Sequence, residues 1–68
     1  MNANLLIKFR ENKKYSQEQM AKLLGYKSKA SYSLIESGKT KITIDLANKL
    51  VKILGLKSKD ILDIFFDN

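Results

Sequence analysis

The sequence contains neither cysteine nor histidine, and these two absences exclude much of the chemistry open to a small protein. Without cysteine the chain can form no disulfide and no thiolate metal site. Without histidine it lacks the commonest general base and the commonest metal ligand. The remaining residues show no nucleophile–base pair, metal cluster or phosphate-binding loop. We therefore expect no enzymatic activity, no cofactor, no metal and no small-molecule ligand.

Long apolar runs are missing as well. No segment approaches the roughly 20 apolar residues of a membrane-spanning helix, and no signal-peptide pattern opens the chain. We expect a soluble, cytoplasmic protein without a membrane partner. The 68 residues predict a single domain, residues 1–68, with no room for a separate effector or oligomerisation domain.

Positive charge, in contrast, is abundant and unevenly distributed. The net charge is +6; residues 1–41 hold nine basic and three acidic side chains, whereas residues 42–68 hold four of each. The whole surplus lies in the first part of the chain, which predicts a polyanionic partner on one side of the molecule. A merely solvated, lysine-rich surface is the alternative interpretation.

Residues 16–41 predict two short helices that are joined tightly and followed by a basic loop. Ser16 is a strong N-cap residue, and Gln19 three positions later completes a capping box. Gly25 ends the first helix, Ser28 is the N-cap candidate for the second, and Gly38 ends that one. This spacing leaves only a short connection between the two helices.

The second of these helices is expected to have an inward and an outward face. Tyr32 and Ile35 mark the inward face at helical spacing, and Leu34 lies roughly opposite them at 100° per residue, which argues against a core position for it. The outward face is thin, and lysines flank both its ends. A DNA groove can accept a helix of this kind. Its residues are Ala30, Ser33, Leu34 and Ser37.

Three further helices complete an all-α fold of five. Residues 3–12 carry apolar side chains at helical spacing, Thr43 is expected to cap a helix over 44–54, and Ser58 to start one from 59 to about 66. The last helix has two apolar stripes. Ile61, Ile64 and Phe65 form one, and Leu62 and Phe66 form the other.

The ordered set of residues resembles the helix-turn-helix of the phage repressor/Cro family (Xre-like regulators). Between Gly25 and Ser28 this chain has two residues where the common pattern has one. The resemblance runs from Leu6 to Ile61 and implies a compact five-helix, lambda-repressor-like domain with the motif at its second and third helices. It is carried by Arg10, Ser16, Gln17, Glu18, Ala21, Leu24, Gly25, Ser28, Ser31, Tyr32, Ile35, Glu36, Gly38 and Lys39.

Side-chain chemistry and the resemblance together assign two sets of DNA contacts. Phosphate contacts position a protein on DNA, whereas contacts to base edges specify a sequence. Lysine can reach guanine O6 and N7, and apolar side chains can meet the thymine methyl group. We assign base reading to Lys29, Ala30, Ser33 and Leu34. We assign phosphate binding to Gln17, Lys27, Ser28, Ser31, Lys39, Thr40 and Lys41, with an ordinary polar role as the alternative for Gln17.

The resemblance also implies a structural ion pair between Arg10 and Glu36, which would tie the first helix to the third. The alternative for Arg10 is a plain surface cation. At the other end of the chain, a second apolar stripe left in water would mark a partner surface. We expect a homodimer interface that contains Leu62, Phe65 and Phe66, unless both stripes are buried or the end is frayed.

These features predict a sequence-specific regulator of transcription that binds double-stranded DNA. As a dimer it would place two recognition helices in successive major grooves of a palindromic operator. The alternative is a protein-interaction module of the same fold, antitoxin-like or anti-repressor, that binds a partner through Leu34 and Tyr26. The basic half of the chain argues against the alternative.

Overall fold

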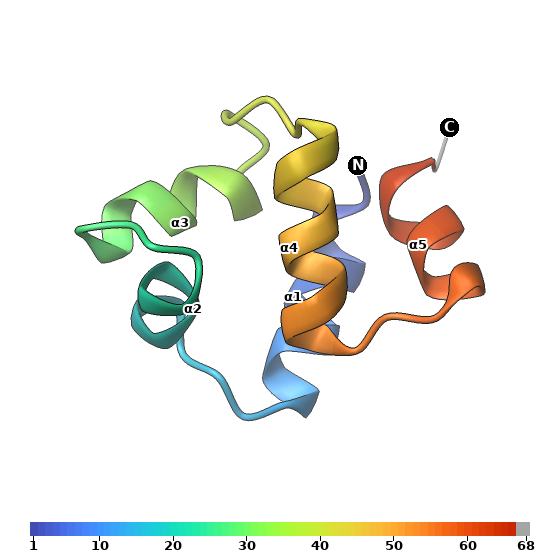
Figure 1. Ribbon diagram of the computed structural model, residues 1–68, viewed down its shortest axis with the longest axis horizontal. Coiled ribbons are helices and arrows are strands. Elements are labelled where there is room, and N and C mark those ends of the chain that lie inside the picture. The colour runs from blue at the N-terminus through green and yellow to red at the C-terminus, as the bar shows by residue number, and fades with distance from the viewer. Residues whose placement is uncertain (67–68) are drawn as a thin grey trace.

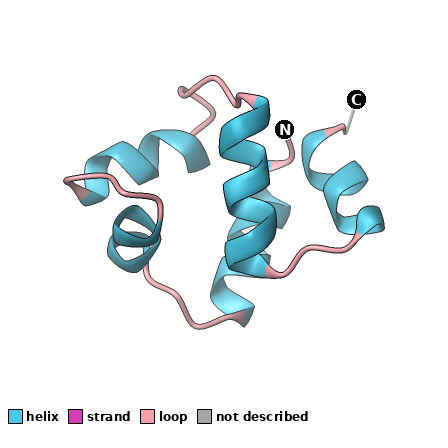
Figure 2. Ribbon diagram, viewed as in Figure 1, coloured by secondary structure: helices cyan, strands magenta, loops and turns pink. Residues whose placement is uncertain are grey.

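Five α-helices make up the described part of the computed structural model, residues 1–66 (Figures 1 and 2). In Figure 1 α2 and α3 lie together on the left, α1 and α4 occupy the middle, and α5 lies on the right. This confirms the predicted all-α fold with the helix-turn-helix at α2 and α3. The helices are α1 (Ala3–Asn12), α2 (Gln17–Leu23), α3 (Lys29–Glu36), α4 (Ile44–Leu54) and α5 (Ser58–Phe65).

Local hydrogen bonds explain where most of these helices begin. The Ser16 hydroxyl accepts a bond from the Gln19 N–H at 3.0 Å, and the Gln19 side chain accepts one from the Ser16 N–H at 2.8 Å. This is the predicted capping box, which satisfies two N–H groups that a helix start leaves free. The Thr43 hydroxyl likewise accepts from Leu46 N–H at 3.1 Å. The predicted caps at Ser16 and Thr43 are therefore confirmed.

The predicted start of the last helix needs a correction of one residue. Ser58 is the first residue of α5 rather than its cap; Lys57 precedes the helix, and its N–H donates to the Asp60 carboxylate at 2.9 Å. Ser28 occupies the predicted N-cap position of α3, although its side chain makes no capping hydrogen bond. The Ser31 N–H donates instead to the Ser28 carbonyl oxygen at 3.2 Å.

Glycine ends both helices of the helix-turn-helix in the same way. Gly25 and Gly38 have φ angles of +83° and +79°, a left-handed conformation that costs other residues energy. After α2, Tyr26 N–H donates to Ala21 O at 2.8 Å and Gly25 N–H to Lys22 O at 3.0 Å. This pair of hydrogen bonds is the Schellman motif, and the same pair recurs at the end of α3. The chain therefore turns sharply after α2 and again after α3.

One hydrophobic core joins all five helices, because each contributes at least one fully buried side chain. The fully buried set comprises Leu6, Met20, Tyr32, Ile35, Leu50, Leu54 and Ile64. The start of the chain is fixed to α5 by a hydrogen bond of 2.6 Å from Asn2 N–H to Ile64 O. Each helix in residues 1–66 is too short or too polar to cross a membrane.

Candidate DNA interface

The outward face of α3 is open to solvent, while its inward face is packed in the core. Tyr32 and Ile35 are fully buried, whereas Ala30 is exposed and the Leu34 side chain is 45% exposed. Ser33 is half-buried between them. An apolar leucine surrounded by small residues on an exposed helix face gives a thin surface without bulky obstruction. Such a surface suits insertion between two DNA backbones.

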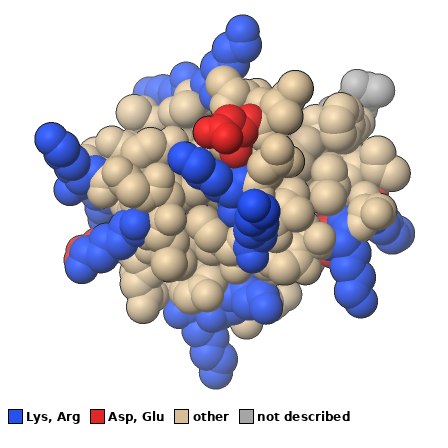
Figure 3. All heavy atoms as spheres, in the orientation of Figure 1, with Lys and Arg blue, Asp and Glu red and all other residues tan. Residues whose placement is uncertain are grey.

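Exposed lysines stand at both ends of this face. Lys27 and Lys29 lie at the start of α3, and Lys39 and Lys41 lie in the loop that follows it. Figure 3 shows cationic side chains projecting over α2 and α3 on the left and beside that loop at the top. Other lysines project elsewhere on the molecule. The surplus of positive charge lies within residues 1–41, and four of the nine basic residues in that range flank α3, whereas the lysines of residues 42–68 are matched by an equal number of acidic groups.

The loop after α3 is held tightly to the end of the helix. The Leu34 carbonyl oxygen accepts hydrogen bonds from Lys39 N–H at 3.0 Å and Thr40 N–H at 3.2 Å. The Ser37 hydroxyl donates to the same oxygen at 3.1 Å. The backbone that carries Lys39 is thus fixed relative to Leu34. A contact by this loop to a phosphate would therefore set the depth at which Leu34 enters the groove.

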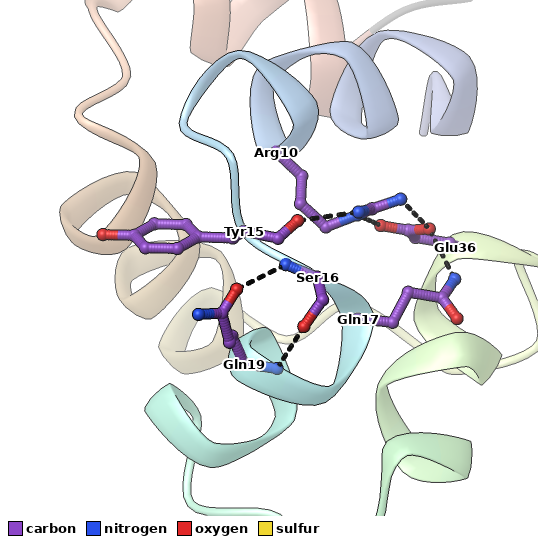
Figure 4. Close-up of polar contacts among 6 residues, drawn as sticks. All are labelled: Arg10, Tyr15, Ser16, Gln17, Gln19 and Glu36. Atoms are coloured by element: carbon purple, nitrogen blue, oxygen red, sulfur yellow. Dashed lines mark hydrogen bonds and ion pairs between the residues drawn. The ribbon is translucent and has the colours of Figure 1, made fainter.

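Behind α3, the structure brings Arg10 and Glu36 together in an ion pair (Figure 4). Arg10 Nε lies 2.6 Å from Glu36 Oε2, and the two side chains are only 12% and 5% exposed. Arg10 also donates through Nη1 to the Tyr15 carbonyl oxygen at 2.8 Å. One guanidinium therefore connects α1, the segment before α2, and the end of α3. The pair fixes α3 from its buried side.

Gln17 joins the same network instead of lying free on the surface. Its Nε2 donates to Glu36 Oε1 at 2.8 Å, and the residue is half-buried at the start of α2 (Figure 4). An amide nitrogen carries two N–H groups, so one remains for another acceptor. The bond to Glu36 limits the orientations of that second group. The bond itself was not expected from the sequence, because an exposed first-turn glutamine has no local signal for a partner 19 residues away.

Opposing effects act on the ionisation of Glu36. Burial alone would raise the pKa of its carboxyl, but contacts with Arg10, Tyr32 and Gln17, together with the Arg10 charge, lower it below the ordinary value of 4.5. Burial beside this carboxylate raises the pKa of the Tyr32 hydroxyl, which makes no hydrogen bond of standard geometry among the described residues. Glu36 is thus ionised and Tyr32 neutral at physiological pH.

This lowered pKa predicts a dependence of stability on acid. A carboxyl whose pKa is lower in the folded state stabilises the fold above its unfolded pKa of 4.5, and this contribution is lost as the pH falls through the folded pKa. We expect the free energy of unfolding to fall steeply below about pH 4.5 and Glu36→Gln to flatten that decline. Urea unfolding followed by circular dichroism at several pH values measures both.

The matched control for the acid dependence is Glu18→Gln. Glu18 is exposed and lies 4.0 Å from Lys22, a separation at which a surface ion pair contributes little. We expect the Glu18→Gln variant to lose stability on acidification as the unmodified protein does. Equal acid profiles for the unmodified protein and Glu36→Gln would show that other carboxyl groups control the effect.

The remaining assigned residues fall into two places. Ser28 and Ser31 lie together at the start of α3, with their hydroxyl oxygens 3.5 Å apart, beside the exposed lysines. The C-terminal residues lie on α5, away from α2 and α3 (Figure 1). Leu62 and Phe66 are 59% and 68% exposed, while Phe65 is half-buried against the core. The predicted stripe of Ile61, Ile64 and Phe65 is thus packed against the core, whereas the stripe of Leu62 and Phe66 is exposed.

Comparison with known proteins places these observations in a family. A helix-turn-helix family model matches residues 6–62, which is most of the chain. The protein therefore belongs to the Cro/C1-type (Xre) helix-turn-helix family, a class of DNA-binding domains rather than enzymes. Neither the curated proteins nor the solved structures that were compared contain a match. The predicted family, fold and non-enzymatic character are confirmed.

Proposed function

We propose that this protein is a sequence-specific transcriptional regulator that inserts α3 into the major groove of double-stranded operator DNA. The observation that carries the proposal is the exposed, thin face of α3 between two pairs of exposed lysines. Lys29, Ala30, Ser33 and Leu34 are the residues for base contacts. The residues for phosphate contacts are Gln17, Lys27, Ser28, Ser31, Lys39, Thr40 and Lys41.

The Gln17–Glu36 bond gives the phosphate role of Gln17 a physical basis. Glu36 holds one amide N–H of Gln17 at 2.8 Å and thereby positions the other at the start of α2. The backbone N–H groups at a helix start favour an anion in the same place. Arg10 fixes Glu36 in turn. The buried ion pair therefore positions a phosphate contact as well as the recognition helix.

Dimeric binding to a palindromic operator is the second part of the proposal. A two-fold dimer presents two copies of α3 to two half-sites about one helical turn apart. The exposed apolar side chains of α5 favour self-association through the C-terminal end, where Leu62, Phe65 and Phe66 were assigned. The outward face of α3 lacks glutamine, asparagine and arginine, so half-site spacing and DNA shape would supply part of the specificity.

Selection of bound sequences from a random duplex pool tests the proposal directly. We expect an enriched inverted repeat, from which the preferred bases and the half-site spacing can be read. A salt titration on random duplex DNA is the companion measurement, because binding by lysines to phosphates weakens as salt rises. No enrichment together with a flat salt response would reject DNA regulation and favour a protein-interaction module.

Leu34 is expected to contribute to the choice of sequence rather than to general affinity. We expect Leu34→Ala to weaken binding to the selected site by about 1–3 kcal/mol, as a lost base-pair contact does, with little change on random duplex. Fluorescence anisotropy at fixed salt on both DNAs measures the two affinities. Leu23→Ala, a similarly exposed leucine on α2, is the control and should change neither. Equal losses on both DNAs would show that Leu34 does not read bases.

A further inference from the structure

Tyr32 carries a buried hydroxyl that the fold leaves without a partner. The residue lies on the inward face of α3 and is fully buried, and its Oη makes no hydrogen bond within residues 1–66. Phenylalanine would fill almost the same space without a polar group, and a buried hydroxyl without a partner is destabilising. The packing of the core therefore explains the ring of Tyr32 but not its hydroxyl.

The acceptor beside this hydroxyl is the carboxylate of Glu36. Tyr32 lies four residues before Glu36 in α3, and side chains with this spacing are neighbours on one face of a helix. Burial, followed by contact with Glu36, raises the pKa of the Tyr32 hydroxyl. The hydroxyl thus lies next to the carboxylate without being aligned on it in a hydrogen bond of standard geometry.

Two short hydrogen bonds hold the Glu36 carboxylate in the free protein (Figure 4). Arg10 Nε donates to Oε2 at 2.6 Å, and Gln17 Nε2 donates to Oε1 at 2.8 Å. A third bond, from Arg10 Nη2 to Oε1, is long at 3.5 Å. Because Glu36 is buried, loss of the Gln17 bond would leave Oε1 poorly satisfied. Gln17 can therefore leave at little cost only where another donor replaces it.

We propose that Tyr32 is a positioning residue, whose hydroxyl replaces Gln17 on Glu36 when the Gln17 amide turns to a DNA phosphate. Before DNA arrives, the bond to Glu36 holds the amide at the start of α2. The phosphate and the carboxylate are both anions and compete for this one amide. As the amide turns outward, the Tyr32 hydroxyl donates to Oε1. Both carboxylate oxygens keep a donor, and the ion pair with Arg10 keeps α3 in place.

The exchange gives the unpartnered hydroxyl a use in binding. A hydrogen bond that forms only in the DNA-bound state adds to affinity, because it stabilises that state alone. The bond to a carboxylate is also charge-assisted and stronger than one between neutral groups. The trigger, a phosphate at Gln17, rests on the proposed DNA-binding function. The ability of Tyr32 to replace Gln17 does not, and it can be measured on the free protein.

Urea unfolding of Tyr32→Phe, Gln17→Ala and the double variant tests the exchange without DNA. We expect Tyr32→Phe to unfold at the same urea concentration as the unmodified protein or slightly higher, because it removes an unsatisfied group and keeps the ring. Gln17→Ala should lower the unfolding midpoint only slightly, since the hydroxyl takes over the acceptor. In the Tyr32→Phe background the same change should lower the midpoint by at least about twice as much, as residues that share a partner are coupled.

Proton magnetic resonance observes the hydroxyl itself. The Tyr32 hydroxyl proton is identified by its loss in Tyr32→Phe. We expect its signal to move downfield in free Gln17→Ala, and in the unmodified protein when duplex DNA is added, because a charge-assisted hydrogen bond forms. Tyr15→Phe is the matched control, since the Tyr15 ring points away from Glu36 in Figure 4. That variant should keep both responses of the Tyr32 proton.

Binding to random duplex DNA at fixed salt, followed by fluorescence anisotropy, tests the phosphate as the trigger. Tyr32→Phe should weaken binding about tenfold, as loss of a hydrogen bond to a charged group does. In the Gln17→Ala background the same substitution should weaken binding no further, because no amide has to turn. Tyr15→Phe should bind as the unmodified protein does.

Four results would overturn the inference: a strong loss of stability in Tyr32→Phe alone, additive effects of Tyr32→Phe and Gln17→Ala on unfolding, a hydroxyl proton that does not respond to Gln17→Ala, or duplex binding by Tyr32→Phe that equals that of the unmodified protein. The first would show that the hydroxyl already has an acceptor in the free protein. Failure of the unmodified protein to bind any duplex would reject the proposed function, and the two measurements on the free protein would still decide whether Tyr32 replaces Gln17.

Discussion

Glu36→Ala is expected to lower the free energy of unfolding by about 3–5 kcal/mol, because it leaves a buried cation without its partner. Arg10 is only 12% exposed and would retain just the bond to the Tyr15 carbonyl. Gln17 would lose its acceptor as well. Domains hold roughly 0.05–0.15 kcal/mol of stability per residue, so this loss would remove much of the total for 68 residues. Urea unfolding followed by circular dichroism measures it.

A double-mutant cycle shows whether the lost stability comes from the interaction between Arg10 and Glu36. We expect the effects of Arg10→Ala and Glu36→Ala to sum to more than that of the double variant, with a coupling of about 0.5–3 kcal/mol. The control is Lys59 with Asp63, which are 2.7 Å apart but on the surface of α5. Their cycle should show far weaker coupling despite a similar distance, since solvent screens the charges. Independent effects of Arg10 and Glu36 would mean that the pair does not hold α1 to α3.

The helices and their ends were readable from the sequence because the interactions that define them are local. Ser16 and Gln19 are three residues apart, and the glycines at 25 and 38 act within one turn of the helices they end. The inward and outward faces of α3 followed from helical spacing for the same reason. The start of the last helix was placed one residue too late, because the Asp60 carboxylate accepts from the N–H of Lys57 and so makes Lys57 the residue before the helix.

Features that depend on packing were not accessible from local pattern. Arg10 and Glu36 are 26 residues apart, and only the family resemblance suggested their contact. The Gln17–Glu36 bond depends on how closely α2 approaches α3. A hollow in the surface is bounded by the start of the chain, the loop between α3 and α4, the first turns of α4 and the end of α5, and these four segments meet only in the folded chain. The open stripe of α5 was visible in the sequence, whereas the hollow beside it, and the exclusion of Leu62 from that hollow, were not.

Removing Lys39 and Lys41 together is expected to weaken binding to every duplex and to reduce its dependence on salt. Each phosphate contact contributes about 0.9 to the slope of the logarithm of affinity against the logarithm of salt concentration. Losing two contacts should therefore reduce the slope by roughly 1.8, and the loss of affinity between 50 and 200 mM salt should shrink about tenfold. Anisotropy titrations of Lys39→Ala/Lys41→Ala on the selected site and on random duplex measure the slopes.

Lys52→Ala/Lys57→Ala is the matched control, because it removes the same charge from exposed residues near the α4–α5 connection. In Figure 1 that connection lies at the lower end of α4, and the loop after α3 lies above the upper end of α4. The control should keep nearly the full salt slope, since charges more than a Debye length of about 10 Å from the DNA are screened. Equal reductions in both double variants would show that net charge, rather than the loop after α3, governs DNA binding. A reduced slope in the loop variant alone would place two phosphates beside Lys39 and Lys41, and this position would orient the outward face of α3 toward the base edges.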